Sequence, residues 1–115
     1  MLKFEKYGFP PYQRYDYCVT FYQQSVLTGL CRVFPSRYLD NAIELWAFSI
    51  LGEYRGKGLG QQFLQEIITY YRNKTIVLFV EKRNERALHI YRKLGFKIVG
   101  EYRGGSHAWE MRLER

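Results

Sequence analysis

Three parts of this 115-residue sequence have residue types that could bind or move charge: a basic glycine-rich segment, a glutamate inside an apolar run, and a tyrosine on a predicted helix. The glycine-rich segment is Arg55-Gly56-Lys57-Gly58-Leu59-Gly60. It follows an apolar run typical of a buried strand and precedes apolar residues at helical spacing. Its glycines permit positive φ, and the free amides at the start of the next helix carry partial positive charge. The segment is therefore predicted to bind a phosphate group.

This segment matches neither of two common phosphate-binding motifs. A P-loop has four residues between its first glycine and Gly-Lys, followed by Ser or Thr; here three residues separate Gly52 from Gly56, and Gly58 follows Lys57. The dinucleotide-binding fingerprint needs a third glycine at the position of Phe63. The segment is thus neither a P-loop nor a dinucleotide-binding turn.

Glu44 is the only charged residue between Ala42 and Leu51. Burying a carboxylate in a strand costs free energy unless a partner or a function compensates for it. From the residues alone, two interpretations stay open. In one, Glu44 takes part in chemistry. In the other, it lies at the solvent-exposed end of the strand and pairs with a nearby Arg or Lys.

Periodicity and turn residues predict a single α/β domain over residues 1–115, in which a mixed sheet is combined with two helices. The first three strands should form an antiparallel meander. A strand–helix–strand crossover then makes the third and fourth strands parallel neighbours, before a second helix and a C-terminal hairpin. Residues 1–14 are predicted to be irregular. The expected strands are Tyr15–Gln23, Val26–Phe34, Ala42–Leu51, Thr75–Glu81, Phe96–Tyr102 and His107–Leu113, and the expected helices are Leu59–Arg72 and Glu85–Leu94.

The two cysteines bear on the first hairpin. If its turn is centred between Gln24 and Ser25, Cys18 lies opposite Cys31. Their side chains could then touch, but we expect free thiols in a reducing compartment. Neither cysteine has metal-ligand partners at usable spacing, so no metal site is predicted.

The formal net charge of +7 indicates an anionic partner: coenzyme A, nucleic acid, the ribosome or an acidic substrate. Lys and Arg are dispersed along the chain, which argues against a nucleic-acid-binding tail. No apolar run reaches the roughly 20 residues that span a bilayer, and the first residues lack the apolar core of a signal peptide. We therefore expect a cytoplasmic protein with no membrane partner.

Two motifs on successive strand–helix units resemble the GNAT superfamily of acyl-CoA N-acyltransferases. One is Arg-x-x-Gly-x-Gly, beginning at Arg55; the other is Asn-x-x-Ala-x-x-x-Tyr-x-x-x-Gly-Phe, beginning at Asn84. The resemblance extends from about Asp16 to Leu113. It implies a GNAT-like fold in which the two parallel strands splay apart and hold the pantetheine arm of acetyl-CoA. The cofactor-binding residues that it implies are Phe48, Ser49 and Ile50 on the earlier strand, Arg55, Gly56, Lys57, Gly58, Leu59, Gly60 and Gln61 at the pyrophosphate, and Asn84, which is also a good helix N-cap.

The resemblance also implies two catalytic residues. Tyr91 occupies the position that in many members protonates the departing thiolate; its other reading is that the ring packs in the core. Glu44 lies eleven residues before Arg55, the spacing at which some members place the base that deprotonates the amine, directly or through water. Position 79, a glutamate in several members, is Phe79 here. Glu44 and ordered water are therefore the candidate bases.

The predicted function is transfer of an acetyl group from acetyl-CoA directly to a primary amine, on a small molecule or a protein. Family members usually begin with a strand and two helices that wall the acceptor cleft, and only about fifteen residues precede the first clear strand here. The N-terminal segment, a second subunit in a homodimer, or a large acceptor could complete that cleft. Two alternatives are a non-catalytic coenzyme A-binding module and a basic protein associated with nucleic acid or the ribosome.

Overall fold

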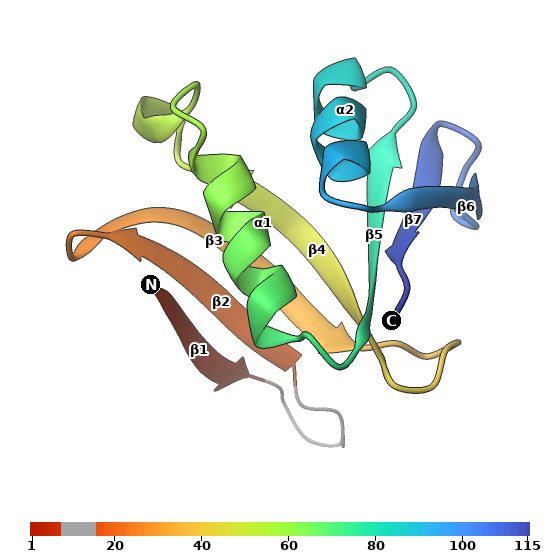
Figure 1. The fold of residues 1–115 in the computed structure, drawn as a ribbon, viewed down its shortest axis with the longest axis horizontal. Helices are drawn as coiled ribbons and strands as arrows, with labels where there is room; N and C mark the ends of the chain where they lie inside the picture. Colours follow the sequence, from red (N-terminus) through yellow and green to blue (C-terminus); the bar gives the residue numbers. More distant parts are fainter. Residues whose placement is uncertain (8–15) are drawn as a thin grey trace.

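The computed structural model describes the backbone of residues 1–7 and 16–115 and the side chains of residues 1–4 and 19–115. Within these ranges the chain forms a mixed sheet with two α helices (Figure 1). In chain order the elements are β1 (Leu2–Tyr7), β2 (Asp16–Gln23), β3 (Val26–Pro35), β4 (Ala42–Ile50), a 3₁₀ turn η1 (Gly52–Tyr54), α1 (Leu59–Tyr70), β5 (Thr75–Glu81), α2 (Glu85–Lys93), β6 (Lys97–Glu101) and β7 (Ala108–Leu113).

The sheet has the strand order β1-β2-β3-β4-β5-β7-β6. Strands β4 and β5 are parallel, and the other neighbouring pairs are antiparallel. This arrangement confirms the predicted α/β class: a meander, a crossover through α1, a second helix and a C-terminal hairpin. It also places β4 and β5 side by side at the centre of the sheet.

The prediction of an irregular N-terminal segment is wrong for Leu2–Tyr7. These residues form β1, which extends the meander by pairing with β2. Leu2 and Phe4 alternate with Lys3 and pack against the core, while Lys3 is exposed, as expected for a strand with one buried face. Residues 8–14 of that segment lie outside the described residues.

The first hairpin has the predicted turn but a different register. Gln24 and Ser25 both have positive φ, 50° and 68°, as a tight two-residue hairpin turn requires. A bulge then leaves Thr28 outside the residue-by-residue register with β2, which shifts the pairing by one position. Cys31 consequently lies opposite Val19, and the prediction that Cys18 lies opposite Cys31 is wrong.

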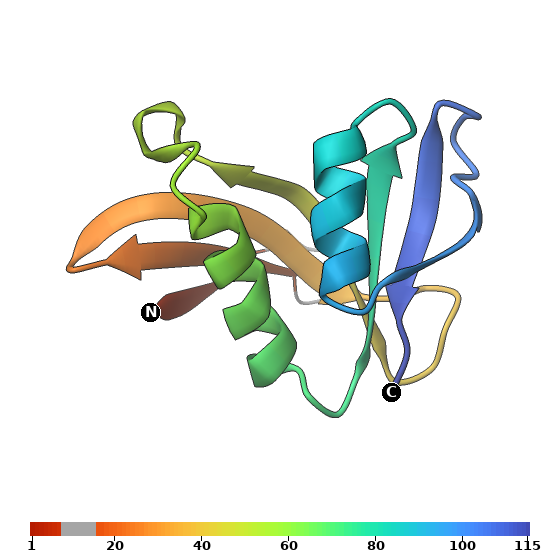
Figure 2. The same ribbon diagram turned by 45° about the horizontal axis from the view of Figure 1, so that its top comes forward.

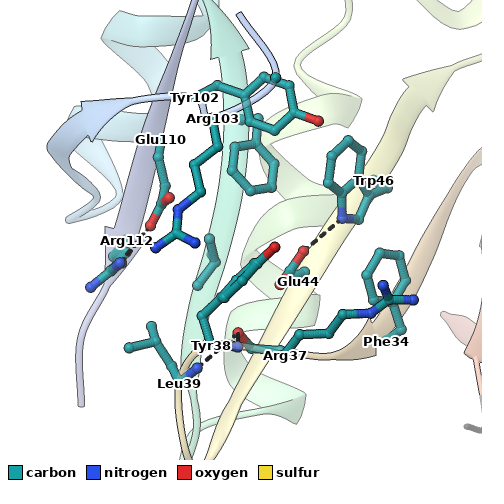
Figure 3. Close-up of a pocket in the computed structure, with 14 residues that line it drawn as sticks. Phe34, Arg37, Tyr38, Leu39, Glu44, Trp46, Tyr102, Arg103, Glu110 and Arg112 are labelled. Carbon is teal, nitrogen blue, oxygen red and sulfur yellow. Dashed lines mark hydrogen bonds and ion pairs between the residues drawn. The ribbon is translucent and has the colours of Figure 1, made fainter.

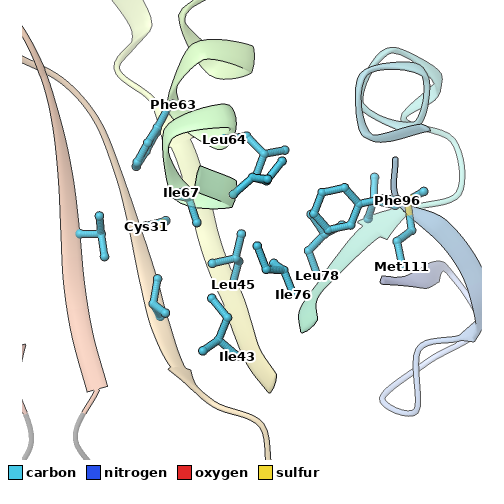
Figure 4. Packing of buried hydrophobic residues seen from close by; sticks show 14 of the residues in the cluster. Cys31, Ile43, Leu45, Phe63, Leu64, Ile67, Ile76, Leu78, Phe96 and Met111 are labelled. Carbon is cyan, nitrogen blue, oxygen red and sulfur yellow. The ribbon is translucent and has the colours of Figure 1, made fainter. Parts of the chain in front are cut away.

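Both helices pack on one face of the sheet, where the apolar core lies (Figures 2 and 4). Alternate residues of the central strands point into this core, and their neighbours point to the opposite face. The core includes Phe63, Leu64 and Ile67 of α1, Leu88 of α2, Ile43 and Leu45 of β4, and Ile76, Leu78 and Val80 of β5. Neither helix could cross a bilayer, since the longer one, α1, has 12 residues.

Candidate active site

The two central parallel strands separate after a short contact. Residues Ala42–Glu44 of β4 pair with Thr75–Val77 of β5, and the strands then diverge (Figure 1). On the other edge of β4, the register with β3 is interrupted near Ala47, whose φ is +53°. A non-glycine residue at positive φ inside a strand marks a bulge, which bends the strand. The bend leaves the second half of β4 with a backbone edge that β5 does not pair.

A cavity of about 340 Å³ lies where the strands have separated. It brings together Phe48 of β4 with Asn84 and Tyr91 of the second motif, which sequence analysis placed at one site. Ser49 and Ile50 lie farther along β4, pair with β3, and are not among the residues that line this cavity. The lining residues are Leu45, Trp46, Ala47, Phe48, Leu64, Leu78, Phe79, Val80, Glu81, Asn84 and Tyr91.

The glycine-rich loop connects the end of β4 to the start of α1. Gly56 and Gly58 have φ of 78° and 75°, and a Cβ atom at either position would meet no atom within 4 Å. These glycines are therefore required by the backbone conformation rather than by lack of space. The first helical hydrogen bond runs from the Gln62 amide to the Gly58 carbonyl, so the amides from Gly58 to Gln61 have no acceptor within the helix. They are available to an anion.

The side chains of Arg55 and Lys57, in the glycine-rich loop, lie close to residues that precede the loop. Arg55 Nε donates a hydrogen bond to the Ile50 carbonyl at 3.0 Å, which ties the loop to the end of β4. Lys57 Nζ lies 5.8 Å from the centre of the Tyr54 ring. A Cβ atom at Gly60 would lie 3.6 Å from Ile50 Cγ1, an ordinary contact, so packing alone does not require glycine at that position.

Tyr91 and Asn84 belong to the short helix α2 and its cap. The Tyr91 ring lies 6.1 Å from that of Phe96 and is half-buried, so the packing reading is confirmed in part. Burial raises the pKa of the Tyr91 phenol above its ordinary value, which keeps the hydroxyl protonated. Asn84 Oδ1 accepts a hydrogen bond from the Ala87 amide at 3.2 Å, which confirms the predicted helix cap.

Glu44 is buried, with 5% of its surface exposed. Its Oε1 accepts a hydrogen bond from Trp46 Nε1 at 3.0 Å. Among the side chains that the structure describes, no cation lies within ion-pair distance of this carboxylate. The interpretation of Glu44 as a solvent-exposed residue in a salt bridge is therefore wrong, and its burial needs another explanation.

A second cavity of about 490 Å³ lies on the sheet face away from the helices, with Glu44 in its wall (Figure 3). Its aromatic side chains are in contact: Trp46 lies 4.7 Å from Phe79 and 5.9 Å from Tyr102, ring centre to ring centre. Trp46 and Phe79 also line the first cavity, so they form a shared wall. The lining residues are Phe34, Ser36, Arg37, Tyr38, Leu39, Glu44, Trp46, Val77, Phe79, Tyr102, Arg103, Gly104, Glu110 and Arg112.

Sequence analysis missed this second cavity because its walls come from five separate segments of the chain. One part of the signal was readable: Glu44 and Trp46 are two residues apart in a predicted strand and must share a face. The remainder depends on strand register, which places Glu44 opposite Phe34 and Val77, and Phe79 opposite Glu110.

The diverging parallel strands, the cavity between them and the glycine-rich helix start together define a class: α/β proteins whose two central parallel strands splay apart beside a glycine-rich turn. Residues 3–96 match the model of the acetyltransferase (GNAT) family. The chain therefore belongs to this family, which confirms the resemblance seen in the sequence.

Comparisons with individual proteins agree with this assignment. The chain is 36% identical over 61 residues to the 5-NmdU N-acetyltransferase of Pseudomonas phage PaMx11, covering 53% of this chain and 44% of that protein. It is 33% identical over 92 residues to the spermine/spermidine N(1)-acetyltransferase of Bacillus subtilis (strain 168), covering 72% of this chain and 60% of that protein. The chain thus spans about half the length of these curated relatives.

One solved structure shows the same fold. It is the PaiA N-acetyltransferase of Thermoplasma acidophilum in complex with coenzyme A, with a TM-score of 0.70 and 20% identity, covering 87% of this chain and 61% of that one. At this identity the likeness concerns the fold alone.

Proposed function

We propose that the chain is an N-acetyltransferase that moves an acetyl group from acetyl-CoA to a primary amine. The observation that carries the proposal is the cavity between β4 and β5, which opens beside Phe48, Asn84 and Tyr91 and lies on the same strand–loop–helix unit as the glycine-rich turn. A thioester carrier with a pyrophosphate group needs both features in this order. Family membership supports the same reading.

The residues present fit acetyl-CoA, whose thioester supplies the activated acetyl group. The unpaired backbone edge of β4 after Glu44 offers amides and carbonyls to the pantetheine arm. In the proposal, Phe48, Ser49 and Ile50 bind this arm and Asn84 contacts it from α2. The pyrophosphate is held by Arg55, Gly56, Lys57, Gly58, Leu59, Gly60 and Gln61.

Two side chains move protons in this proposal. The amine nitrogen first bonds to the acetyl carbon, whose oxygen takes up negative charge, and the carbon–sulfur bond then breaks to release the thiolate. Glu44, which is buried and has no cationic partner among the described side chains, accepts the amine proton directly or through water. The Tyr91 hydroxyl, kept protonated by its raised pKa, gives a proton to the thiolate. Backbone amides of β4 near Phe48 stabilise the developing oxyanion.

Calorimetry with acetyl-CoA, followed by a thiol-release assay against a panel of primary amines, tests this function. We expect saturable binding and steady thiol release with at least one amine. Binding without release with any amine would instead support a non-catalytic coenzyme A-binding module. Absence of binding would refute the proposal.

A further inference from the structure

The cavity on the helix-free face has walls suited to a flat apolar group. Phe34 and Trp46 have nearly parallel rings 6.0 Å apart, and Phe79 and Tyr102 lie 4.8 Å apart. Its volume of about 490 Å³ is in the range of small-molecule sites. Aromatic walls of this kind bind rings or short apolar chains through burial and stacking.

The charged side chains that line this cavity include more arginines than glutamates. Three arginines and two glutamates line it, a net charge of +1. Arg112 is already paired with Glu110, Nη2 to Oε2, at 2.7 Å, and Arg103 lies over the Tyr38 ring at 4.3 Å. The Glu44 carboxylate also lines the cavity, and no cationic side chain within residues 1–4 and 19–115 lies within ion-pair distance of it.

Two cationic side chains therefore remain for a ligand. Arg37 and Arg103 are exposed, lie on the loops after β3 and β6, and are among the residues that line this cavity (Figure 3). Among the described residues, neither forms an ion pair with an acidic side chain. Guanidinium groups in this position favour a carboxylate, phosphate or sulfate.

We propose that the acceptor is a small primary amine with a flat apolar body and an anionic group, and that polyamines are poor ligands. This inference rests on the proposed function, because it takes the amine to lie at Glu44. The apolar body then lies among the aromatic rings, and the anionic group reaches Arg37 and Arg103. A second ammonium group would meet these arginines instead and be repelled.

Three benzylamines that differ only at the para position test this inference. They are 4-(aminomethyl)benzoate, benzylamine and p-xylylenediamine, which carry a carboxylate, a hydrogen and a second aminomethyl group. Their Kd values are measured by calorimetry, with and without coenzyme A. We expect the carboxylate to bind about ten-fold more tightly than benzylamine, and the diamine more weakly than either. Equal affinities, tightest binding of the diamine, or no binding of any of the three would overturn the inference.

Two variants test whether Arg37 and Arg103 cause the tighter binding of the carboxylate compound. In the double variant Arg37→Met/Arg103→Met, the affinities for 4-(aminomethyl)benzoate and benzylamine should differ by no more than about two-fold, since methionine keeps the apolar stem but removes the charge. Arg72→Met, on the exposed end after α1, is the matched control and should keep the full advantage. An unchanged advantage in the double variant would refute the role of these arginines.

The readout separates this inference from the proposed function. Binding needs no acetyl transfer, so the expected affinity order without thiol release would remove the catalytic proposal alone. Thiol release with a preference for the diamine would remove the acceptor inference alone.

Discussion

The glycine-rich loop gives a quantitative test through two matched substitutions, Gly58→Ala and Gly52→Ala. At both positions a Cβ atom would meet no atom within 4 Å, so neither alanine clashes. The positions differ in backbone conformation: Gly58 has φ of 75°, whereas Gly52 lies in the 3₁₀ turn η1 and has no positive φ. Both substitutions reduce the entropy of the unfolded chain equally. The difference between them therefore isolates the cost of alanine in the left-handed region.

That cost is about 1–2 kcal/mol. The entropy of unfolding is about 2.1 cal/mol/K per residue, or about 0.24 kcal/mol/K for 115 residues, so Gly58→Ala should melt about 4–8 °C below Gly52→Ala. Differential scanning calorimetry measures this difference directly. If the loop binds coenzyme A, the ligand should also raise the Tm of Gly58→Ala less than that of Gly52→Ala. Equal melting temperatures would refute the conformational argument.

Three further variants test the reaction and the core. Tyr91→Phe should keep coenzyme A affinity and lower kcat by about 10²-fold. Burial raises the Tyr91 pKa above 10.0, so the contribution of the neutral phenol to the free energy of unfolding is fully present below that pH and is lost as pH rises through the folded-state pKa. Urea denaturation at about pH 9 and about pH 11 should therefore show a larger decrease in the free energy of unfolding for the wild type than for Tyr91→Phe. Glu44→Gln should reduce the rate most near neutral pH, with recovery in a pH–rate profile as the acceptor amine loses its own proton; a loss independent of pH would count against the base role. Gly29→Ala should lower the free energy of unfolding by about 1–3 kcal/mol, seen by thermal denaturation, because its Cβ atom would lie 2.9 Å from Ile50 Cδ1 and 3.0 Å from Phe63 Cδ2; an unchanged Tm would show that these side chains move aside freely.

The sequence predicted well those elements whose limits depend on local residues. The strand Thr75–Glu81 has the predicted limits, and α1 begins at Leu59 directly after Gly58. Helix α2 begins after the Asn84 cap and ends one residue before its predicted end. In each case, a cap, a glycine or a continuous apolar run within the segment is enough to set the boundary.

The bulges could not be predicted, because each depends on how two strands meet. Thr28 and Ala47 are ordinary strand residues by type, and neither is the glycine or asparagine that usually signals positive φ or an irregularity. Their effects are nevertheless large: one separates the two cysteines in register, and the other accompanies the divergence of β4 from β5. The N-terminal strand was missed for a similar reason, since Leu2 and Phe4 show their role only when paired with β2.

The candidate site was predicted unevenly. The loop glycines and the pair Asn84 and Tyr91 carry recognisable spacing, and the structure brings Asn84 and Tyr91 to one cavity. The second cavity, on the helix-free face of the sheet, has no local sequence motif, because Trp46 and Phe79 face one another only after the crossover sets the register of β4 and β5. The sequence motifs therefore predicted part of the proposed donor site, and no motif predicted the second cavity.

The rings of Trp46 and Phe79, which line both cavities, also have a consequence for the order of events. One cavity has Leu64 and Tyr91 in its wall on the helix side, and the other lies on the opposite face of the sheet. In the proposed reaction, the donor and the acceptor would bind on opposite faces of the sheet, so neither would have to leave before the other could bind.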